Sequence, residues 1–464
     1  MASVTNLNDD GPGSLRQAIA TASQGATITF DSSLKGTIVL TSGDLTFNKS
    51  LTVRGPGANN LSIMGNHVGT KKIHILLGTS VTISGLTFTG LNDSGFKSQA
   101  NLTLIDSVVS NNSTPGDGGG IESSGTLVLI NTTISGNRAD SKGTAFDHNK
   151  DFGNGGGIAN EGVLRVINSR IFGNYASTDG GGVYNYYKVP TVSTISNSTI
   201  FNNTACRGGG GIFIRKGDLA LDKTTVSNNK VGNCTGYTLV HPGLGGGIKN
   251  FGTLVLANST VSGNTTPVDG GGIFSGVNTT DLGMLTLTNS TVSGNTSSGG
   301  SGGGIEYEGS QATITFSTLY GNAALNGGGI SIGNNAANKP VQVTLRNSIV
   351  AGNHATTGPD ILGILTSDGY NLIQDPTGTS FVPNNQQATD IIGIQFSDLR
   401  IDPKLSGKPT QTQALLKGSP AIDVIPVDAC HIDGITSDQR GVKRPQGTKC
   451  DIGAYEYVAS SGSR

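Results

Sequence analysis

Acidic and basic side chains that could carry out acid–base chemistry lie in and near the inserted segments of this chain. Asp147 and Asp151 belong to a long insertion, residues 138–154, which is long enough to approach Asp179. Carboxyl groups can donate or accept protons, and a lysine such as Lys249 can act as a base. These four residues are the candidate catalytic group, suited to a lyase or to a hydrolase with paired carboxylates. The alternative is that they lie on ordinary solvated loops.

A column of outward-facing side chains could bind a sugar. It consists of the residue after the Ile or Val that ends each glycine run, and period-two alternation turns it away from the core. The candidate ligand-binding residues are Tyr184, Phe213, Lys249 and Phe274 in this column, with Tyr237 and His241 from an insertion. Aromatic rings in such a column could stack on sugar rings spaced along a polymer. The alternative is that the insertions cover the column and form a satellite core.

The potential for metal binding is limited. Aspartates precede three glycine runs, at Asp117, Asp179 and Asp269. The last two are three repeats apart, roughly 14 Å, which is too far to share one ion. Zinc is disfavoured because the chain has no Cys-x-x-Cys and its six histidines are scattered. We predict no metal site and no required cofactor, with calcium left as an option at the edge formed by the insertions.

Composition narrows the classes of partner. The chain has 464 residues, 72 glycines, 13% charged residues and a net charge of −1. Without a basic stripe, nucleic acid is not expected as a partner. The sequence contains no apolar stretch of about 18 residues that would predict a membrane span, and its first residues do not resemble a signal peptide. We expect a monomer that is secreted or displayed at the cell surface after loss of its export signal.

The elements that position these residues are copies of one repeat. Glycine runs end on a β-branched residue eight times, at Ile121, Ile158, Val183, Ile212, Ile248, Ile273, Ile305 and Ile330. The gaps range from 25 to 37 residues, so about 25 residues form the unit and the excess is insertion. A fixed minimum length indicates stacked copies of one element. Alternating apolar residues without a helical segment indicate three short strands per turn. The predicted fold is all-β, a right-handed parallel β-helix.

A Gly-Asn pair marks one corner of the repeat. Such pairs begin at Gly136, Gly173, Gly263, Gly294, Gly321 and Gly352. Glycine and asparagine tolerate the left-handed backbone conformation that a sharp corner demands. Stacked asparagines can also hydrogen-bond along the axis of the coil. We therefore predict a structural role for these asparagines.

Outward Thr-x-Ser triplets recur in register and offer a third interpretation. Flat threonine arrays are typical of ice-binding solenoids, and triplets 133–135 and 260–262 fit that pattern. Arg170, Phe172 and Phe201 interrupt the array, and outward Thr and Ser are common in strands. Ice binding is therefore disfavoured.

The open ends of a β-helix need covers, because exposed sheet edges invite aggregation. Residues 13–20 predict a short amphipathic helix with Ser14 as its N-cap. The chain divides into residues 1–90 (N-terminal cap and first coils), 91–357 (regular repeats with insertions on one edge) and 358–464 (last coil and C-terminal cap).

The four cysteines predict two disulfides. Cys206 and Cys234 follow equivalent corners of adjacent coils, within disulfide reach. Cys430 and Cys450 bracket residues 438–441 and would pin the C-terminal cap. Two local pairs favour an oxidising compartment.

Both ends of the chain carry a family resemblance. Residues 6–19, Asn-Leu-Asn-Asp-Asp-Gly-Pro-Gly-Ser-Leu-Arg-Gln-Ala-Ile, resemble the opening of bacterial exported β-helix proteins. Residues 418–423, 438–441, 444–445 and 450–456 are similar to the C-terminal signature of proteins labelled "choice-of-anchor Q". The glycine-rich repeat also resembles that of polymorphic outer-membrane adhesins. The resemblance implies a pectate-lyase-like right-handed β-helix on a bacterial surface or secreted, without an established activity.

Together these observations predict a structural or adhesin-like module that binds polysaccharide or cell-surface glycan along the inserted edge. The alternative is a polysaccharide lyase or glycoside hydrolase that acts at the same edge.

Overall fold

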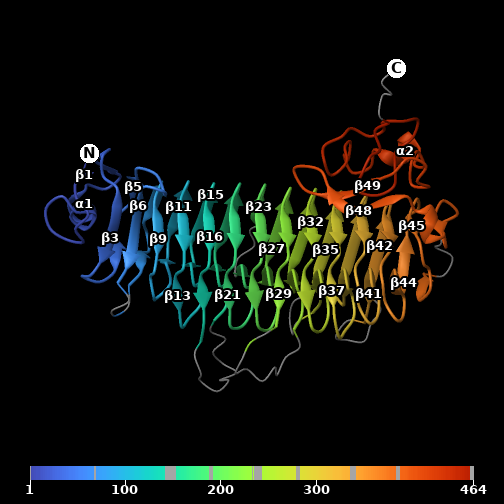
Figure 1. Ribbon diagram of the computed structural model, residues 1–464, viewed down its shortest axis with the longest axis horizontal. Helices are drawn as coiled ribbons and strands as arrows, with labels where there is room; N and C mark the ends of the chain where they lie inside the picture. The colour runs from blue at the N-terminus through green and yellow to red at the C-terminus, as the bar shows by residue number, and fades with distance from the viewer. Residues whose placement is uncertain are drawn as a thin grey trace. The chain divides into compact units, whose positions relative to one another are not determined.

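The computed structural model describes residues 2–66, 69, 71–141, 153–187, 192–232, 234, 243–277, 283–334, 341–382 and 387–459. The chain forms two compact units. Unit 1 comprises residues 1–217 and 232–238, and unit 2 comprises residues 218–231 and 239–464. Both are built from short parallel strands (Figure 1), as the repeat predicts. The three-part division of the chain stays a prediction. Among the described residues, no helix has the length and apolar character needed to cross a membrane.

Unit 1 stacks its strands in four parallel sheets, named A to D. Sheet A contains β2 (Thr27–Phe30), β5 (Leu51–Arg54), β8 (Ser80–Ser84), β11 (Asn101–Ile105), β15 (Thr126–Ile130), β19 (Val163–Ile167) and β23 (Val192–Ser196), with β1 (Ala2–Val4) beside β2. Sheet B contains β3 (Gly36–Leu40), β6 (Leu61–Gly65), β9 (Thr87–Thr89), β12 (Val108–Ser110), β16 (Thr133–Ser135), β20 (Arg170–Phe172) and β24 (Thr199–Phe201). Sheet C contains β4 (Leu45–Phe47), β7 (Ile73–Ile75), β10 (Phe96–Ser98), β14 (Ile121–Ser123), β18 (Ile158–Asn160), β22 (Val183–Tyr186) and β26 (Ile212–Lys216). Sheet D contains β13 (Ser113–Thr114), β17 (Arg138–Ala139), β21 (Tyr175–Ala176) and β25 (Thr204–Ala205).

Unit 2 repeats the same four sheets. Sheet A contains β27 (Asp218–Asp222), β31 (Thr253–Ala257), β35 (Met284–Thr288), β39 (Gln311–Thr315) and β42 (Gln342–Arg346). Sheet B contains β28 (Thr225–Ser227), β32 (Thr260–Ser262), β36 (Thr291–Ser293), β40 (Thr318–Tyr320), β43 (Ile349–Ala351), β45 (Leu372–Ile373) and β47 (Ile391–Ile392). Sheet C contains β30 (Ile248–Asn250), β34 (Ile273–Ser275), β38 (Ile305–Tyr307), β41 (Ile330–Ile332) and β44 (Ile361–Ser367), with β46 (Thr379–Phe381) beside β44. Sheet D contains β29 (Lys230–Val231), β33 (Thr265–Thr266) and β37 (Thr296–Ser297).

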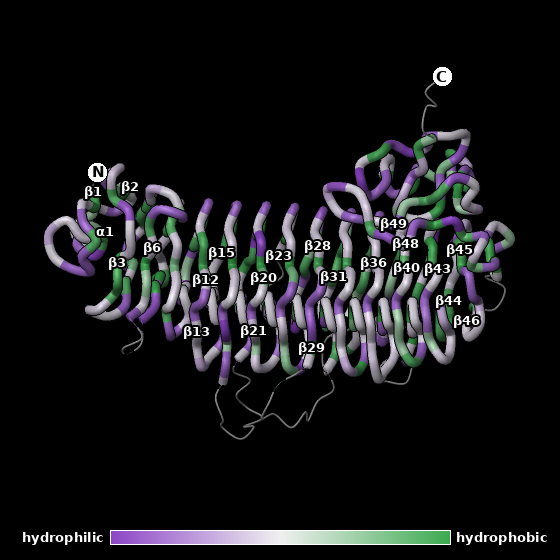
Figure 2. The backbone as a smooth tube through the Cα atoms, viewed as in Figure 1, coloured by the Kyte–Doolittle hydropathy of each residue, from purple (hydrophilic) through white to green (hydrophobic). Residues whose placement is uncertain are grey.

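The core of each unit consists of the inward-facing residues of these strands. In β15, Leu127 and Leu129 are fully buried while their neighbours in the strand are half-buried, as alternation predicts. Leu127 pairs in register with Leu164 on the next coil, so identical layers of aliphatic side chains stack along the axis. Hydrophobic residues recur along successive strands in Figure 2. Register is therefore fixed by burial, because a shift of one residue would turn the apolar layer outward.

Asparagines at the Gly-Asn corners form a buried hydrogen-bond ladder in each unit. In unit 1, the backbone N–H and the Nδ2 of Asn137 both donate to Oδ1 of Asn174, each at 3.0 Å. In unit 2, Asn264 donates to Oδ1 of Asn295 in the same way, at 3.0 Å and 2.9 Å. The corner glycines hold the left-handed conformation, with φ of 62° at Gly294. The predicted structural role of the Gly-Asn pair is confirmed.

The N-terminal helix covers the first coil as predicted. It runs from Leu15 to Thr21 (α1), and the Ser14 hydroxyl accepts a hydrogen bond from the N–H of Gln17 at 3.1 Å. Leu15 and Ile19 are buried on the coil beneath. Arg16 pairs with Asp9 at 2.7 Å. Burial opposes ionisation of Asp9, but the hydrogen bonds from Arg16, Ser42 and Thr41 outweigh it and hold the pKa of Asp9 below its usual value.

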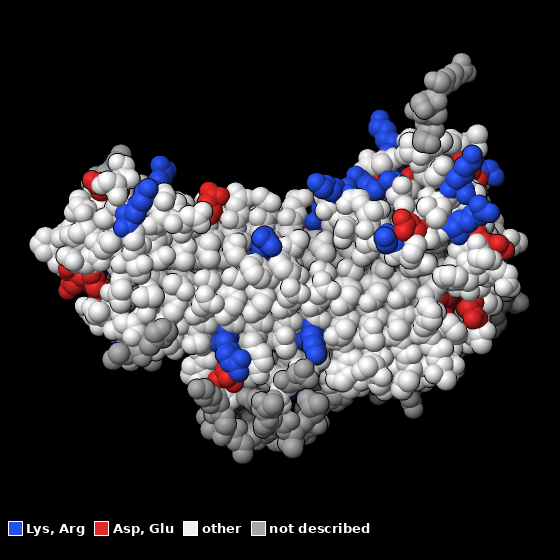
Figure 3. All heavy atoms as spheres, in the orientation of Figure 1, with Lys and Arg blue, Asp and Glu red and all other residues white. Residues whose placement is uncertain are grey.

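The last part of unit 2, the C-terminal segment (residues 396–459), leaves the coil and packs on it. It contains η1 (Phe396–Asp398), the antiparallel pair β48 (Ile401–Ser406) and β49 (Thr412–Leu415), and α2 (Val427–Cys430). An ion pair between Arg444 and Glu456, at 2.9 Å, is completely enclosed in this segment. Within unit 2, the charged side chains in Figure 3 gather over this segment.

Both predicted disulfides are present. Cys206 pairs with Cys234 in unit 1, with 5.7 Å between their Cα atoms. Cys430 pairs with Cys450 in the C-terminal segment, with 6.0 Å between theirs. No free cysteine occurs in the described part of the chain.

The C-terminal segment also covers part of the Thr-x-Ser array. Gln439 Nε2 donates to Oγ1 of Thr260 at 2.9 Å, and the Thr291 hydroxyl bonds to Oε1 of Gln439 at 2.6 Å. Thr260 and Thr291 are consequently buried. An ice-binding plane needs these threonines exposed, so the burial removes that interpretation for this stretch of the array.

Candidate functional site

The outward column of sheet C holds four of the candidate ligand-binding residues, and all four are buried. Tyr184 and Phe213 are 5% and 4% exposed in unit 1, and Lys249 and Phe274 are 9% and 4% exposed in unit 2. The rings of Tyr184 and Phe213 meet edge to face, with centroids 5.6 Å apart. This is the arrangement expected of the alternative interpretation, a covered satellite core, rather than of rings open to a sugar.

The glycine run itself lies close over this column. Gly270 adopts φ of 70°, and a Cβ built on it would lie 2.7 Å from both Cα and Cβ of Phe274. Only glycine allows the corner to pass so near to the following strand. The same residues that define the repeat therefore restrict access to the side chain at this position.

Asp179, a candidate catalytic residue, is committed to an ion pair. Its Oδ2 lies 2.7 Å from Nη2 of Arg207, and its side chain is only 3% exposed. Nε of Arg207 also donates to this oxygen, at 3.1 Å, so the buried carboxylate already has a charge-assisted partner. Arg215 similarly donates to the hydroxyl of Tyr184, at 3.2 Å. Asp147, Asp151, Tyr237 and His241 lie outside the described residues.

Asp117 occupies the same position in its own glycine run and has a different environment. Burial raises the pKa of Asp117 to about 6, although backbone hydrogen bonds from Asn154 and Gly153 counteract the shift. Both backbone bonds are 2.8 Å long and end on Oδ1. The aspartate therefore orders the start of the neighbouring glycine run, which is a structural task.

A cluster of acids in unit 2 was not anticipated as a group. Glu306 pairs with Phe274 of the preceding coil in the outward column of sheet C. Glu308 lies two residues later, just after the end of β38. A Cβ placed on Gly333 would lie 3.5 Å from Oε1 of Glu306 and 3.6 Å from Oε1 of Glu308, so the two carboxyl groups face the same point. Oε2 of Glu306 is buried without a hydrogen-bond partner.

The environment of this cluster favours the protonated form of Glu306. Burial is the main cause that raises its pKa well above the usual value, and the charges of Asp269 and Glu308 add to it, against a hydrogen bond with Ser331. Burial and Asp269 also raise the pKa of Glu308. A carboxyl group whose pKa is raised by burial beside acidic neighbours is the pattern of a general acid.

The sequence contains the signal for this cluster, but in two separate columns. Asp269 belongs to the column before the glycine runs and Glu306 to the column after them. Because β34 and β38 pair on neighbouring coils, the column before the glycine runs and the column after them lie close to each other. Among the described residues, no group of three or more His, Cys, Asp or Glu side chains is spaced to hold a metal ion. The option of calcium at the inserted edge, which involves Asp147 and Asp151, lies outside the described residues and stays a prediction.

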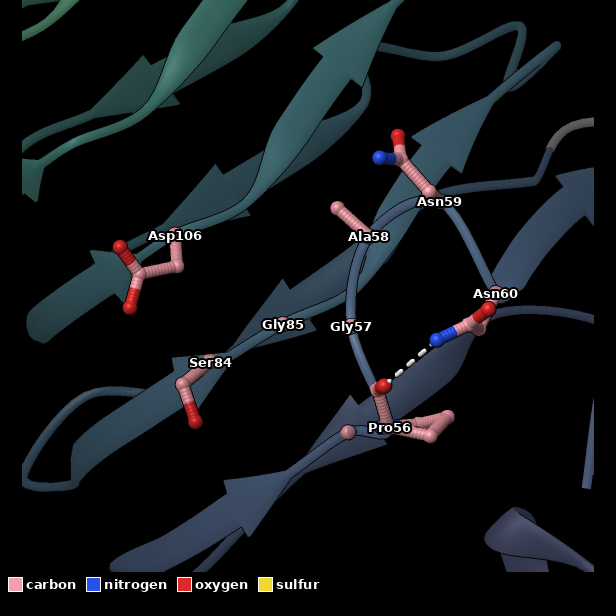
Figure 4. A pocket seen from close by; sticks show the side chains of 9 residues that line it. Pro56, Gly57, Ala58, Asn59, Asn60, Ser84, Gly85 and Asp106 are labelled. Atoms are coloured by element: carbon pink, nitrogen blue, oxygen red, sulfur yellow. Dashed lines mark hydrogen bonds between the residues drawn. The ribbon is translucent and has the colours of Figure 1, made fainter. Parts of the chain in front are cut away.

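Unit 1 also contains an open depression. It is lined by residues 55–60 with Ser84, Gly85 and Asp106 (Figure 4). Asn60 Nδ2 donates to the Pro56 carbonyl across the loop at 2.8 Å. The carboxylate of Asp106 accepts a bond from Asn131 at 3.0 Å. None of the candidate residues lines this depression.

Sheet B of unit 1 carries a half-buried aromatic pair that breaks the Thr-x-Ser pattern. The rings of Phe172 and Phe201, on successive coils, stack at 4.8 Å with 15° between their planes. The guanidinium of Arg170 lies 5.2 Å and 5.3 Å from the two ring centroids. Both rings are half-buried and Arg170 is exposed. We call these three residues the Arg-Phe platform.

Comparison with known proteins supports the fold. Residues 156–357 match the family model described as "Right handed beta helix region", in agreement with the predicted hand. No curated protein matches the sequence. The chain is similar to the crystal structure of pectate lyase Pel9A, with 15% identity over 98% of this chain and 96% of that one, and a TM-score of 0.36.

Two further solved structures are also polysaccharide lyases. The chain covers 59% of the PL6 family alginate lyase AlyGC using 94% of its own length, with 12% identity and a TM-score of 0.43. It covers 91% of a mannuronic acid specific polysaccharide family 6 lyase from human gut microbiota using 82% of its own length, with 10% identity and a TM-score of 0.38. The fold of this chain is a right-handed parallel β-helix, with polysaccharide lyases among its structural neighbours.

Proposed function

We propose that this protein is a secreted or surface-displayed, adhesin-like β-helix module that binds glycans without cleaving them. The observation that carries the proposal is the half-buried stack of Phe172 and Phe201 on successive coils, with the exposed Arg170 beside it. The two rings stack on each other and form an apolar surface beside the guanidinium of Arg170, and the coil provides a rigid support for it. The two disulfides support an oxidising, extracellular location.

The state of the predicted catalytic edge supports binding over turnover. Asp179 is neutralised by Arg207, and the column of Tyr184, Phe213, Lys249 and Phe274 is buried. Substrate would have to displace buried side chains to reach them. A glycan can reach the Arg-Phe platform without such a rearrangement.

The test asks whether the protein is retained on a polysaccharide and leaves that polysaccharide uncleaved. The purified protein is passed over immobilised acidic and neutral polysaccharides, and the same polymers are incubated with it and assayed for new unsaturated or reducing ends. We expect retention on at least one polymer and no new ends. Absence of retention on every polymer, with the protein folded, contradicts the proposal.

The second candidate function is a polysaccharide lyase or glycoside hydrolase, and the acidic cluster of unit 2 favours it. Glu306 has an unpartnered carboxyl oxygen and a raised pKa, so it could protonate a leaving-group oxygen while Glu308 or Asp269 accepts a proton. The burial of Glu306, at 4% exposure, limits contact with a polymer and ranks this function second.

Turnover, if found, can be assigned with matched variants. Glu306→Gln should abolish it, because the amide cannot donate the proton. Glu122→Gln is the control, since Glu122 lies in the corresponding column of unit 1 and pairs with Lys97 at 3.0 Å. Equal loss in both variants would indicate a general effect on folding.

A further inference from the structure

The outer face of sheet A in unit 1 carries a row of isoleucines on three successive coils. Ile105, Ile130 and Ile167 pair in register on β11, β15 and β19. Ser84 and Ser196 occupy the same position on the coils before and after them, so the row ends in a polar residue on both sides. The isoleucine row is therefore a local departure from the polar pattern of the neighbouring coils.

Three valines widen this row into a patch. Val128 is an outward residue of β15, Val163 begins β19, and Val192 begins β23, the next strand of the sheet. Ile167 and Val192 are 38% and 49% exposed, and the other members are half-buried. Contiguous exposed apolar side chains mark interaction sites, whereas scattered ones do not. We call this patch the Ile-Val face, and it consists of Ile105, Val128, Ile130, Val163, Ile167 and Val192.

Two opposite charges accompany the Ile-Val face. Arg165 is an outward residue of β19 and pairs with Val128. It is exposed, and its side chain forms no ion pair or hydrogen bond with the residues that the structure describes. Asp106 directly follows β11 at the corner of the coil and is also exposed. One oxygen of Asp106 accepts a hydrogen bond from Asn131 at 3.0 Å, which leaves the other oxygen for a partner.

The two charges cannot pair within one chain. Arg165 is in register with Val128 and Thr103, so it lies two coils and three residues away from Asp106. Strand spacings of about 4.8 Å and a rise of about 3.3 Å per residue separate their backbones by roughly 14 Å. In a two-fold dimer every contact occurs twice, so each Arg165 can meet the Asp106 of the other copy. Sheets also pack face to face with interdigitated side chains in β-sandwiches.

We propose that the Ile-Val face is the interface of a two-fold dimer, in which sheet A of one copy packs on sheet A of a second copy. The aliphatic side chains of both copies fill the space between the sheets, and Arg165 of each copy pairs with Asp106 of the other. A second copy fits the face because it supplies an apolar surface of equal extent and both charges. This inference is separate from glycan binding, and it replaces the monomer expected from the sequence.

The apolar contact is tested by sedimentation velocity of the whole chain over a concentration series. Six aliphatic residues per copy form a small interface, so we expect a weak dimer, with a dissociation constant on the order of micromolar or above. Ile130→Thr should weaken the dimer about ten-fold, because apolar surface is lost in both copies. Leu77→Thr is the matched control. Leu77 is 80% exposed in the turn between β7 and β8, outside the face, so its replacement should leave the dissociation constant unchanged.

The charge pairing is tested by reversal. Arg165→Asp and Asp106→Lys each place like charges opposite one another at two contacts, and each should weaken the dimer about ten-fold or more. Lys223 holds the corresponding corner of unit 2 with φ of 46°, so a lysine fits the backbone conformation required at position 106. The chain that carries both changes has opposite charges at both contacts again. Its dissociation constant should return to within about three-fold of the original value.

The outcomes decide the proposal as follows, with circular dichroism to verify that each variant folds. Weaker dimers in the single variants and recovery in the double variant support the interface. A chain that stays monomeric at every soluble concentration overturns the proposal and leaves the face to a partner of another kind. A dimer that Ile130→Thr and both reversals leave unchanged would use another surface. An open series of larger species would contradict the two-fold contact, which closes at two copies.

Discussion

Removal of one ladder asparagine should destabilise its neighbouring coils strongly. Asn295 is fully buried in unit 2, and its Oδ1 accepts two hydrogen bonds from Asn264 while its Nδ2 donates to Asn322 and to the carbonyl of Val261. Asn295→Ala leaves both donors of Asn264 buried without an acceptor. Each unsatisfied donor costs about 1–3 kcal/mol, so the expected loss is roughly 2–6 kcal/mol.

The measurement must be local, because a repeat array need not unfold in one step. Hydrogen exchange by mass spectrometry, on peptides covering β32, β36 and β40, reports the opening of these coils directly. A loss of 2 kcal/mol corresponds to roughly 30-fold faster exchange, and larger losses to more. We expect the acceleration to be greatest at β32 and β36, which the missing side chain links.

Asn258→Gly is the matched control. Asn258 is an asparagine at another corner of the same unit, with φ of 50° and one side-chain hydrogen bond, to Asp222 at 3.0 Å. Glycine keeps the left-handed conformation, so the cost should stay near 1 kcal/mol. If Asn295→Ala accelerates exchange no more than Asn258→Gly does, the buried ladder does not stabilise the coil and the reasoning fails.

Three other perturbations test separate parts of the structure. Gly272→Ala would place a Cβ 2.6 Å from the carbonyl oxygen of Gly304, so it should lower the midpoint of urea unfolding more than Gly294→Ala, where no atom lies within 4 Å. Replacing Cys206 and Cys234 by alanine opens a link between residues 28 apart, and loop entropy predicts a loss of roughly 3–4 kcal/mol in calorimetry. Burial raises the pKa of Asp360 to about 7, from 3.8, so the folded state binds the proton more tightly. The stability that the protonated Asp360 contributes is complete below pH 3.8, and it declines as pH rises to about 7. Asp360→Asn should flatten that part of the stability–pH curve, and an unchanged slope would contradict the assignment.

The fold could be predicted because its signals are local and repeated. Alternation at Leu127 and Leu129 sets the inward face of a strand, and Gly136 with Asn137 sets the corner that follows. The same residue pattern recurs in each repeat, so an insertion in one coil does not obscure the pattern in the others. The disulfide between Cys206 and Cys234 followed from the same counting, since equivalent positions of adjacent coils lie one strand spacing apart.

The candidate site could not be predicted to the same degree, because burial on the outside of a coil depends on neighbours that alternation does not encode. Tyr184 and Phe274 point outward as expected, yet both are covered. The partner of Asp179 is Arg207, 28 residues away on the next coil, and the sequence does not distinguish that pair from a free carboxylate. The charge of Asp269 acts on Glu306 only because neighbouring coils bring their two columns close, and the spacing along the chain does not encode that lateral geometry.

The glycine run explains both why the fold could be predicted and why the outward column of sheet C is covered. Its last glycine leaves room inside for the ladder, as at Gly272, where a Cβ would meet Nδ2 of Asn295 at 2.9 Å. Its first glycine, as at Gly270, passes close over the column outside. A motif that builds the repeat on both sides of sheet C leaves little freedom there for ligand contacts. Selection for binding can act more freely on sheet B of unit 1, where the default residues are small and half-buried, as at Thr133 and Ser135. A departure from that default, such as Arg170 beside Phe172, is therefore more informative about function than any residue of the glycine-run column.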